Sequence, residues 1–229
     1  MTDTVIFDLD GTLIDTEKYF KVFWIQAAAQ FGYTMSEEQA LTLRSMGRPF
    51  APDRFKEWFG VNCDYDKIRD YRRLLMTKHL DEVGIELKPG VCETLEWLKK
   101  NNYFIALCTA TPLDRATQQL IETGIYSYFD EIVSAVQVDR GKPAPDVYLF
   151  ACERLGKQPH ICFAVEDSPN GVRSAADAGL QVIMVPDQTN PDMELRNLLY
   201  ACIPTLKDLP QILWVQKDSK VHNNSNTKG

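Results

Sequence analysis

Short apolar runs alternate with amphipathic stretches along most of the chain. Each run has the length and the β-branched content of a buried parallel strand, and each amphipathic stretch has the periodicity of a helix. Strand alternating with helix indicates an α/β fold with a doubly wound parallel sheet, a Rossmann-like core. The predicted strands are Val5–Leu9, Tyr103–Cys108, Glu131–Ser134, Ile161–Val165 and Gln181–Val185, and the predicted helices are Val91–Lys100, Leu113–Thr123, Asp146–Leu155 and Asn170–Ala178.

One interval after the first predicted strand contains only helical patterns. An interval of about 70 residues is too long for an ordinary connection between strand and helix. We therefore predict an inserted helical cap at residues 16–85 and an α/β catalytic core formed by residues 1–15 and 86–215, rather than helices that simply pack on the sheet. Residues 216–229 are polar and unpatterned, and we expect a disordered tail there. The helices expected in the cap are Glu17–Phe31, Glu37–Arg44, Ala51–Phe59 and Asp66–Leu80.

Composition excludes several classes of protein. The chain has 229 residues, with 25 Lys and Arg against 32 Asp and Glu, so its formal net charge is −7. This acidity argues against a nucleic-acid partner or a membrane surface, which usually require a basic patch. The cysteines are scattered without a CxxC pair, and no histidine lies near another, so the pattern does not form a zinc site. We expect a cytoplasmic, monomeric protein with reduced thiols.

Two aspartates, Asp8 and Asp10, stand at the end of the first predicted strand. Open α/β sheets bind their ligands just beyond the carboxyl ends of the strands. Residues two apart along a strand project to one side, so the two carboxylates converge and repel each other unless a cation intervenes. The pair predicts a site for a hard metal ion, with Mg²⁺ the natural choice. The alternative is a pair of ordinary turn or capping aspartates.

The other strand ends carry matching chemistry. Thr109–Thr111 follows the second predicted strand with a hydroxyl and free N–H groups at a helix start, which suits an anion. Lys142 follows the third strand, and Glu166 and Asp167 follow the fourth. Each residue alone has an ordinary interpretation as a helix cap or a solvated lysine. Because the four strand ends meet at one edge of the sheet, together they predict a site for phosphoryl transfer.

Four segments of the chain together resemble the motifs of a known family. Asp8-Leu-Asp10-Gly11-Thr12-Leu13-Ile-Asp15-Thr16, then Thr109, then Gly141-Lys142-Pro143, then Glu166-Asp167-Ser168-x-x-Gly171 resemble the four ordered motifs of the haloacid dehalogenase-like hydrolases. The resemblance covers about residues 4–186. It is closest to the subgroup with a helical cap after the first motif, which includes the β-phosphoglucomutases and many phosphatases of small metabolites.

The resemblance implies a role for each motif residue. Asp8 is expected to be the nucleophile that forms an aspartyl-phosphate, and Asp10 the general acid and base. Lys142 is expected to bind phosphate and to orient Asp8. The Mg²⁺ ligands would be the Asp8 and Asp167 carboxylates and the Asp10 carbonyl, with Glu166 close by. Phosphate and substrate binding are assigned to Thr109, Ala110, Thr111 and Lys142, and to Gly47 and Arg48 of the cap segment Ser45-Met46-Gly47-Arg48, which resembles a substrate-contacting loop.

Three functions follow as hypotheses. The first is a Mg²⁺-dependent phosphatase of a small phosphorylated metabolite, with a sugar phosphate among the candidates. The second is a phosphosugar mutase in the same fold, and the third is a non-catalytic binding protein, which is disfavoured because every expected catalytic position is kept. The β-phosphoglucomutases resemble Asp15-Thr16-x-x-Tyr19 but place a histidine next, whereas this chain has Phe20, which cannot transfer a proton. The phosphatase is therefore favoured over the mutase.

Overall fold

A parallel sheet forms the centre of the protein. In a computed structural model, which describes residues 3–214, six strands lie in the order β3-β2-β1-β4-β5-β6 and every neighbouring pair is parallel. The predicted doubly wound α/β fold is confirmed. The strands are β1 (Thr4–Phe7), β2 (Phe104–Thr109), β3 (Glu131–Ser134), β4 (Cys162–Glu166), β5 (Gln181–Met184) and β6 (Leu199–Cys202). The predicted set lacked β6, and it ended β1 at Leu9, two residues too late.

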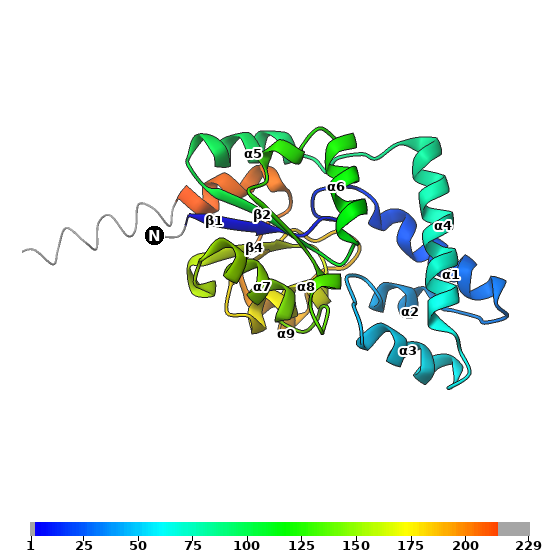
Figure 1. Cartoon of the computed structure of the whole chain (residues 1–229). Coiled ribbons are helices and arrows are strands. Elements are labelled where there is room, and N and C mark those ends of the chain that lie inside the picture. The colour runs from blue at the N-terminus through cyan, green and yellow to red at the C-terminus, as the bar shows by residue number, and fades with distance from the viewer. Residues whose placement is uncertain (1–2, 215–229) are drawn as a thin grey trace, which may run out of the picture.

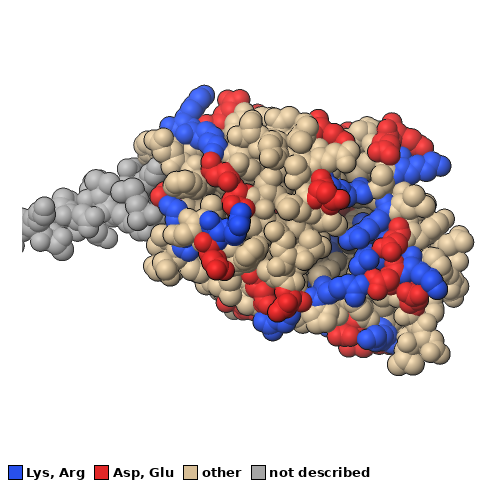
Figure 2. Space-filling model, in the orientation of Figure 1, with Lys and Arg blue, Asp and Glu red and all other residues tan. Residues whose placement is uncertain are grey.

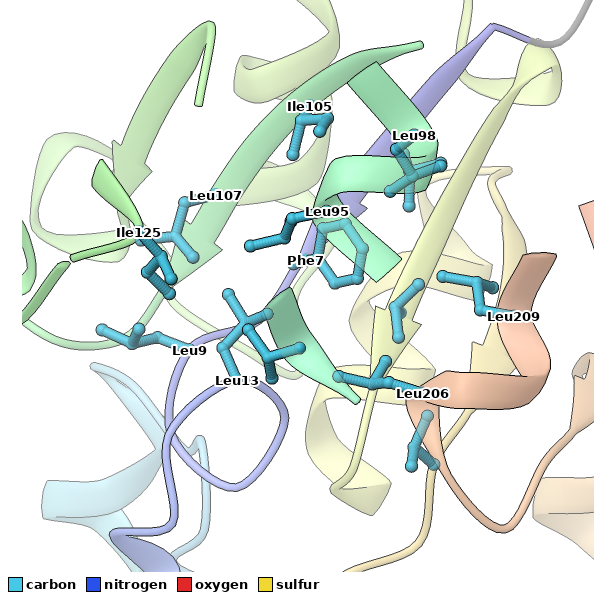
Figure 3. Close-up of a cluster of buried hydrophobic side chains, with 14 of the residues drawn as sticks. Phe7, Leu9, Leu13, Leu95, Leu98, Ile105, Leu107, Ile125, Leu206 and Leu209 are labelled. Carbon is cyan, nitrogen blue, oxygen red and sulfur yellow. The ribbon is translucent and has the colours of Figure 1, made fainter. Parts of the chain in front are cut away.

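Helices cover both faces of the sheet (Figure 1). Along β1, the side chains of Val5 and Phe7 join one apolar cluster and that of Ile6 joins another, because successive residues of a strand face opposite sides. The first cluster, shown in Figure 3, includes side chains from α5 and α6, and the second includes side chains from α7, α8 and α9. These helices are α5 (Val91–Lys100), α6 (Leu113–Glu122), α7 (Asp146–Leu155), α8 (Pro169–Asp177) and α9 (Met193–Arg196).

Four further helices follow β1 before the chain returns to the sheet. In Figure 1 they lie beside the sheet, past the ends of its strands. Their buried apolar side chains form a third cluster around Trp24 and Phe55, separate from the two on the sheet. The helices are α1 (Glu17–Gln30), α2 (Glu37–Thr42), α3 (Phe50–Phe59) and α4 (Tyr65–Val83). We call them the helical insert; the domain boundaries predicted around it stay predictions.

Short 3-10 helices complete the described part of the chain, at Tyr126–Tyr128, Ala135–Gln137, Pro159–Ile161 and Leu206–Asp208. The predicted tail, residues 216–229, lies outside the described residues. Among the helices described, none is both long enough and apolar enough to cross a bilayer.

Candidate active site

The sheet order brings the acidic strand ends together. β1 lies between β2 and β4, so Asp8, which follows β1, is a neighbour of both Thr109 and Glu166. Asp8, Glu166 and Asp167 are buried, and their carboxylates offer oxygen atoms that all lie within 4.8 Å of one another. The predicted meeting of the acids that follow β1 and β4 is therefore observed for Asp8, Glu166 and Asp167. The predicted convergence of the Asp8 and Asp10 carboxylates is not observed, because the Asp10 carboxylate lies outside this cluster and accepts hydrogen bonds from Thr16 and Thr111.

Lys142 lies wholly buried among these acids. Its Nζ donates hydrogen bonds to Asp8 Oδ1 (2.6 Å), to Glu166 Oε1 (2.6 Å) and to the Cys108 carbonyl (3.0 Å). The hydroxyl of Tyr148, on α7, donates to the same Glu166 oxygen at 2.6 Å. A single ammonium thus fixes the nucleophile candidate and its neighbouring carboxylate. The plain alternative, a solvated surface lysine, is wrong because the side chain is 0% exposed.

The electrostatics of this cluster call for a further cation. Burial raises the pKa of Asp8 well above its usual range, despite the attraction of Lys142, and burial likewise raises that of Asp167. Burial opposes the charge of Lys142, but Asp8 and Glu166 outweigh this effect and raise its pKa. Within the described part of the chain, Asp8 Oδ2 and Glu166 Oε2 are buried with no hydrogen-bond partner. Buried unpartnered oxygens of this kind fit a hard divalent cation such as Mg²⁺.

The Asp10 carboxylate has hydrogen-bond partners of its own outside the acidic cluster. Its Oδ1 accepts a hydrogen bond from Thr16 (2.6 Å) and its Oδ2 accepts one from Thr111 (2.7 Å). The Oγ1 of Thr109 accepts a hydrogen bond from the Thr111 N–H at 3.0 Å. The hydroxyl of Thr111, assigned to phosphate binding from the sequence, thus holds Asp10 in this structure.

A cavity of about 330 Å³ joins these residues to the insert. Its walls include most of the predicted site residues, and the lining also contains Phe20. The backbone of the insert meets the core here: the Gly47 N–H donates to the Lys142 carbonyl (2.8 Å), and the Gly141 N–H donates to the Arg48 carbonyl (2.7 Å). The predicted residues that line the cavity are Asp8, Asp10, Gly47, Arg48, Thr109, Ala110 and Thr111.

Arg48 lines this cavity with its guanidinium turned toward α4. It forms an exposed ion pair with Asp66 and lies 5.5 Å from the centre of the Tyr65 ring. The sequence therefore predicted the position of Arg48 at the cavity, but its partners in the insert became visible only in the structure.

Sequence reasoning missed a buried arginine at the site. Arg44, directly after α2, is 1% exposed and pairs with Asp167, one of the predicted metal ligands. Its Nε donates to Glu17 (3.1 Å) and its Nη1 to Thr189 (3.1 Å). Burial raises the pKa of Glu17 to about 8, although Arg44 opposes the shift. Tyr148 was also missed, since neither residue stands in a motif or at a predicted strand end.

Fold and site together define a class: an α/β protein that presents a buried cluster of carboxylates and a buried lysine at the carboxyl edge of a parallel sheet. Residues 5–185 match the sequence profile described as haloacid dehalogenase-like hydrolase. This match spans most of the chain. The protein belongs to the haloacid dehalogenase-like hydrolases.

Named relatives narrow the enzyme class. The phosphorylated carbohydrates phosphatase of Thermotoga maritima is 30% identical over 79% of this chain and 83% of that protein. Hexitol phosphatase A of Escherichia coli is 31% identical over 79% of this chain and 81% of the Escherichia coli protein. We accordingly identify this chain as a phosphoric monoester hydrolase.

Solved structures share the fold. β-Phosphoglucomutase from Clostridium difficile superposes with a TM-score of 0.80 at 24% identity, covering 97% of this chain and 99% of its own. CbbY from Rhodobacter sphaeroides, in complex with phosphate, superposes with a TM-score of 0.74 at 24% identity. The match covers 91% of this chain and 96% of the CbbY chain. At this identity the likeness shows the fold alone.

Proposed function

We propose that this enzyme is a Mg²⁺-dependent phosphatase that hydrolyses a small phosphorylated metabolite through an aspartyl-phosphate on Asp8. One observation carries the proposal: Lys142 holds Asp8 Oδ1 at 2.6 Å, while Asp8 Oδ2 is buried and has no partner among the described residues. A carboxylate fixed through one oxygen presents the other to a cation and a substrate. The pattern supports a positioned nucleophile more than a structural ion pair.

Asp8, Glu166 and Asp167 would hold the Mg²⁺, with the main-chain carbonyl of Asp10 as a further ligand. When bound, the ion neutralises charge on the non-bridging phosphate oxygens. Lys142 adds a second positive charge next to the same phosphate oxygens. In Thr109–Thr111 the Thr111 hydroxyl is bound to Asp10 and the Thr111 N–H to Thr109, so the Thr109 hydroxyl and the Ala110 N–H are the groups that we assign to the phosphate.

Asp10 would carry the protons. In the first step an Asp8 oxygen bonds to phosphorus, the ester P–O bond breaks, and protonated Asp10 gives its proton to the leaving oxygen. In the second step Asp10 takes a proton from water, the water oxygen bonds to phosphorus, and the bond to Asp8 breaks. Inorganic phosphate leaves and Asp8 is restored. The hydrogen bonds from Thr16 and Thr111 fix the Asp10 carboxyl for both transfers.

The cavity and the relatives support a metabolite of sugar-phosphate size. A volume of about 330 Å³ lies at the small end of ligand sites. The two phosphatase relatives are named for phosphorylated carbohydrates and for hexitol, which supports a polyol or sugar phosphate as the substrate. We also propose that the enzyme acts in the cytoplasm, which its free cysteines support, and that it is a monomer.

Phe20 favours the phosphatase over a mutase. It lines the cavity and packs edge-on against Trp24, with ring centres 6.0 Å apart. A mutase must keep water from its phospho-aspartate until a sugar hydroxyl accepts the phosphoryl group, and a phenyl ring supplies no proton transfer for that exchange.

Hydrolysis of p-nitrophenyl phosphate with and without Mg²⁺ tests the proposal. We expect Asp8→Asn to abolish turnover, because an amide neither attacks phosphorus nor ligates the ion as a carboxylate does. Asp10→Asn is expected to bind Mg²⁺ almost normally in calorimetry but to lose most turnover, since its ligand atom is a backbone carbonyl. Near-normal hydrolysis by Asp8→Asn would contradict the covalent mechanism.

A second assay separates phosphatase from mutase. With β-glucose 1-phosphate and a bisphosphate activator, we expect phosphate release from small esters to be far faster than formation of glucose 6-phosphate. Stoichiometric isomerisation without free phosphate would establish the mutase instead.

A further inference from the structure

Charges of both signs line the cavity. The acidic residues in its lining are Asp8, Asp10, Glu17 and Asp139, and five arginines line it as well. One of them, Arg48, pairs with Asp66, and the other four lie on helices. These arginines come from one face of α4 and from α6, and Figure 2 shows Lys and Arg side chains gathered with acidic ones along the hollow between these helices. The arginines in question are Arg69, Arg72, Arg73 and Arg115.

These arginines differ in how their charge is compensated. Arg69 lies 3.0 Å from a carboxylate oxygen of Asp70, while Arg73 approaches Asp70 only to 4.0 Å. Arg115 donates a hydrogen bond to the hydroxyl of Thr77 on α4, which is neutral. Across residues 3–214, no carboxylate lies within ion-pair distance of Arg72 or Arg115. Two guanidinium groups at the cavity therefore lack a protein counter-ion.

Arg72 is held in place without being neutralised. Its guanidinium lies 4.8 Å from the centre of the Phe20 ring and 5.1 Å from that of Trp24, and its Nε is buried without a hydrogen-bond partner. Aromatic faces attract a cation and fix its plane, but they do not accept the in-plane hydrogen bonds of a guanidinium. Such a group is pre-organised for an anion that the protein itself does not provide.

Repulsion among these cations adds to the demand for an anion. Burial lowers the pKa of Arg72 to about 10, and Arg73 and Arg115 also act in that direction. Arg72 is still charged at neutral pH, so the folded protein bears the cost of an uncompensated, partly desolvated charge. Asp10 and Arg72 both line this cavity of about 330 Å³, so one small molecule can reach both residues.

We propose that the physiological substrate carries a second anionic group, a carboxylate or a second phosphate, at the end remote from the transferred phosphoryl group, and that Arg72, assisted by Arg115, binds it. The inference rests on the proposed function, because the transferred group is placed at Asp8. It narrows the substrate from any small phosphate ester to one that is charged at both ends.

Matched pairs of esters test this selectivity. In each pair one member has a second anion and the other ends in a neutral hydroxyl group instead. The pairs are 2-phosphoglycolate with 2-hydroxyethyl phosphate, 3-phosphoglycerate with glycerol 3-phosphate, and fructose 1,6-bisphosphate with fructose 1-phosphate. We expect kcat/KM of the wild type to be higher for the doubly anionic member of at least one pair. The first two pairs probe a carboxylate and the third probes a phosphate.

Variants at Arg72 then test whether this residue causes the preference for a doubly anionic ester. Arg72→Leu is expected to lower kcat/KM for the preferred doubly anionic ester at least about tenfold, as loss of a hydrogen bond between charged groups does. Its partner ester should change less than about threefold, because it makes no charged contact there. Arg72→Lys should retain part of the preference for the doubly anionic ester, since the positive charge remains. If the leucine variant folds poorly, the lysine variant provides the test in its place. Arg54→Leu is the control, because it removes an exposed charge that pairs with Glu57 outside the cavity.

The possible failures are distinguishable. If the wild type hydrolyses neither p-nitrophenyl phosphate nor any of these esters, the proposed function fails. If it hydrolyses p-nitrophenyl phosphate but favours the doubly anionic member of no pair, only the second-anion inference is overturned. Equal losses on both members of the preferred pair in Arg72→Leu would also overturn it, because they would assign Arg72 to packing.

Discussion

Glu166 depends on the absence of a side chain at residue 171. Gly171 lies in the first turns of α8, and a Cβ built there would overlap the buried carboxylate of Glu166. The same carboxylate accepts hydrogen bonds from Lys142 and Tyr148, both at 2.6 Å. Since all of these groups are buried, a displaced carboxylate would lose hydrogen bonds that water does not replace. The glycine therefore positions the lysine that holds Asp8.

We expect Gly171→Ala to lower both the melting temperature and kcat. Alanine in a helix is ordinarily favoured over glycine by about 1 kcal/mol, so a loss of stability would report the clash rather than the helix propensity. Calorimetric melting and hydrolysis of p-nitrophenyl phosphate measure the two effects. Arg173→Ala, also in α8, is the control; it removes a surface ion pair with Glu194 of α9 and should change little. A stabilised, fully active Gly171→Ala would contradict this account.

Among the elements, α4 carries three arginines of the cavity, Arg69, Arg72 and Arg73, so the stability of its first turn matters for the site. Asp64 is its N-cap, and the carboxylate accepts a hydrogen bond from the Lys67 N–H at 3.2 Å. This backbone hydrogen bond lowers the pKa of Asp64 below 3.8. A carboxylate at a helix N-terminus also interacts favourably with the helix dipole. The charged form of Asp64 thus stabilises the folded helix more than the unfolded chain.

The stabilisation by Asp64 should depend on pH. Because its folded-state pKa is depressed, the contribution is present above the unfolded pKa and is lost as the pH falls through the folded value, below 3.8. We expect the melting temperature of the wild type to exceed that of Asp64→Asn at pH 7. The difference should shrink below about pH 4, because asparagine keeps the cap but has no charge to lose. A difference that grows on acidification would contradict the assignment.

At the scale of the whole molecule, the insert and the core meet backbone to backbone. Gly47 and Gly141 lie so close that a Cβ on Gly47 would come within 2.7 Å of the Gly141 Cα. Hydrogen bonds of 2.8 and 2.7 Å join the two loops next to Lys142. Arg44 adds a buried link from the insert to Asp167 in the core. Gly47, assigned to substrate binding from the sequence, thus has a geometric reason to be a glycine.

Gly47→Ala should open this junction. Overpacking of this kind costs about 1–3 kcal/mol, and the displaced loop carries the backbone of Lys142, so we expect lower kcat/KM as well as lower stability. Gly141→Ala should have a similar effect, because it places the methyl group on the other side of the same contact. The double variant should lose less than the sum of the two, since one displacement relieves both clashes. Additive losses would show that the two glycines act independently.

The sequence by itself determined the sheet and the location of the acids. Continuous apolar runs predict buried parallel strands, and a parallel sheet places their carboxyl ends at one edge, so Asp8 and Glu166 could be predicted to meet. Strand β6 could not be predicted in this way. Residues Leu199–Cys202 alternate between half-buried and exposed, and their strand exists because β5 pairs with it at the sheet edge.

Only the tertiary structure decided which side chains complete the site. Arg44 and Asp167 are 123 positions apart in sequence, and Arg72 meets Phe20 through the packing of α4 on α1. Hydrophobic periodicity is a local signal that reports which face of an element is buried. It carries no information on which distant charge lies opposite, because that pairing depends on how the insert packs against the core.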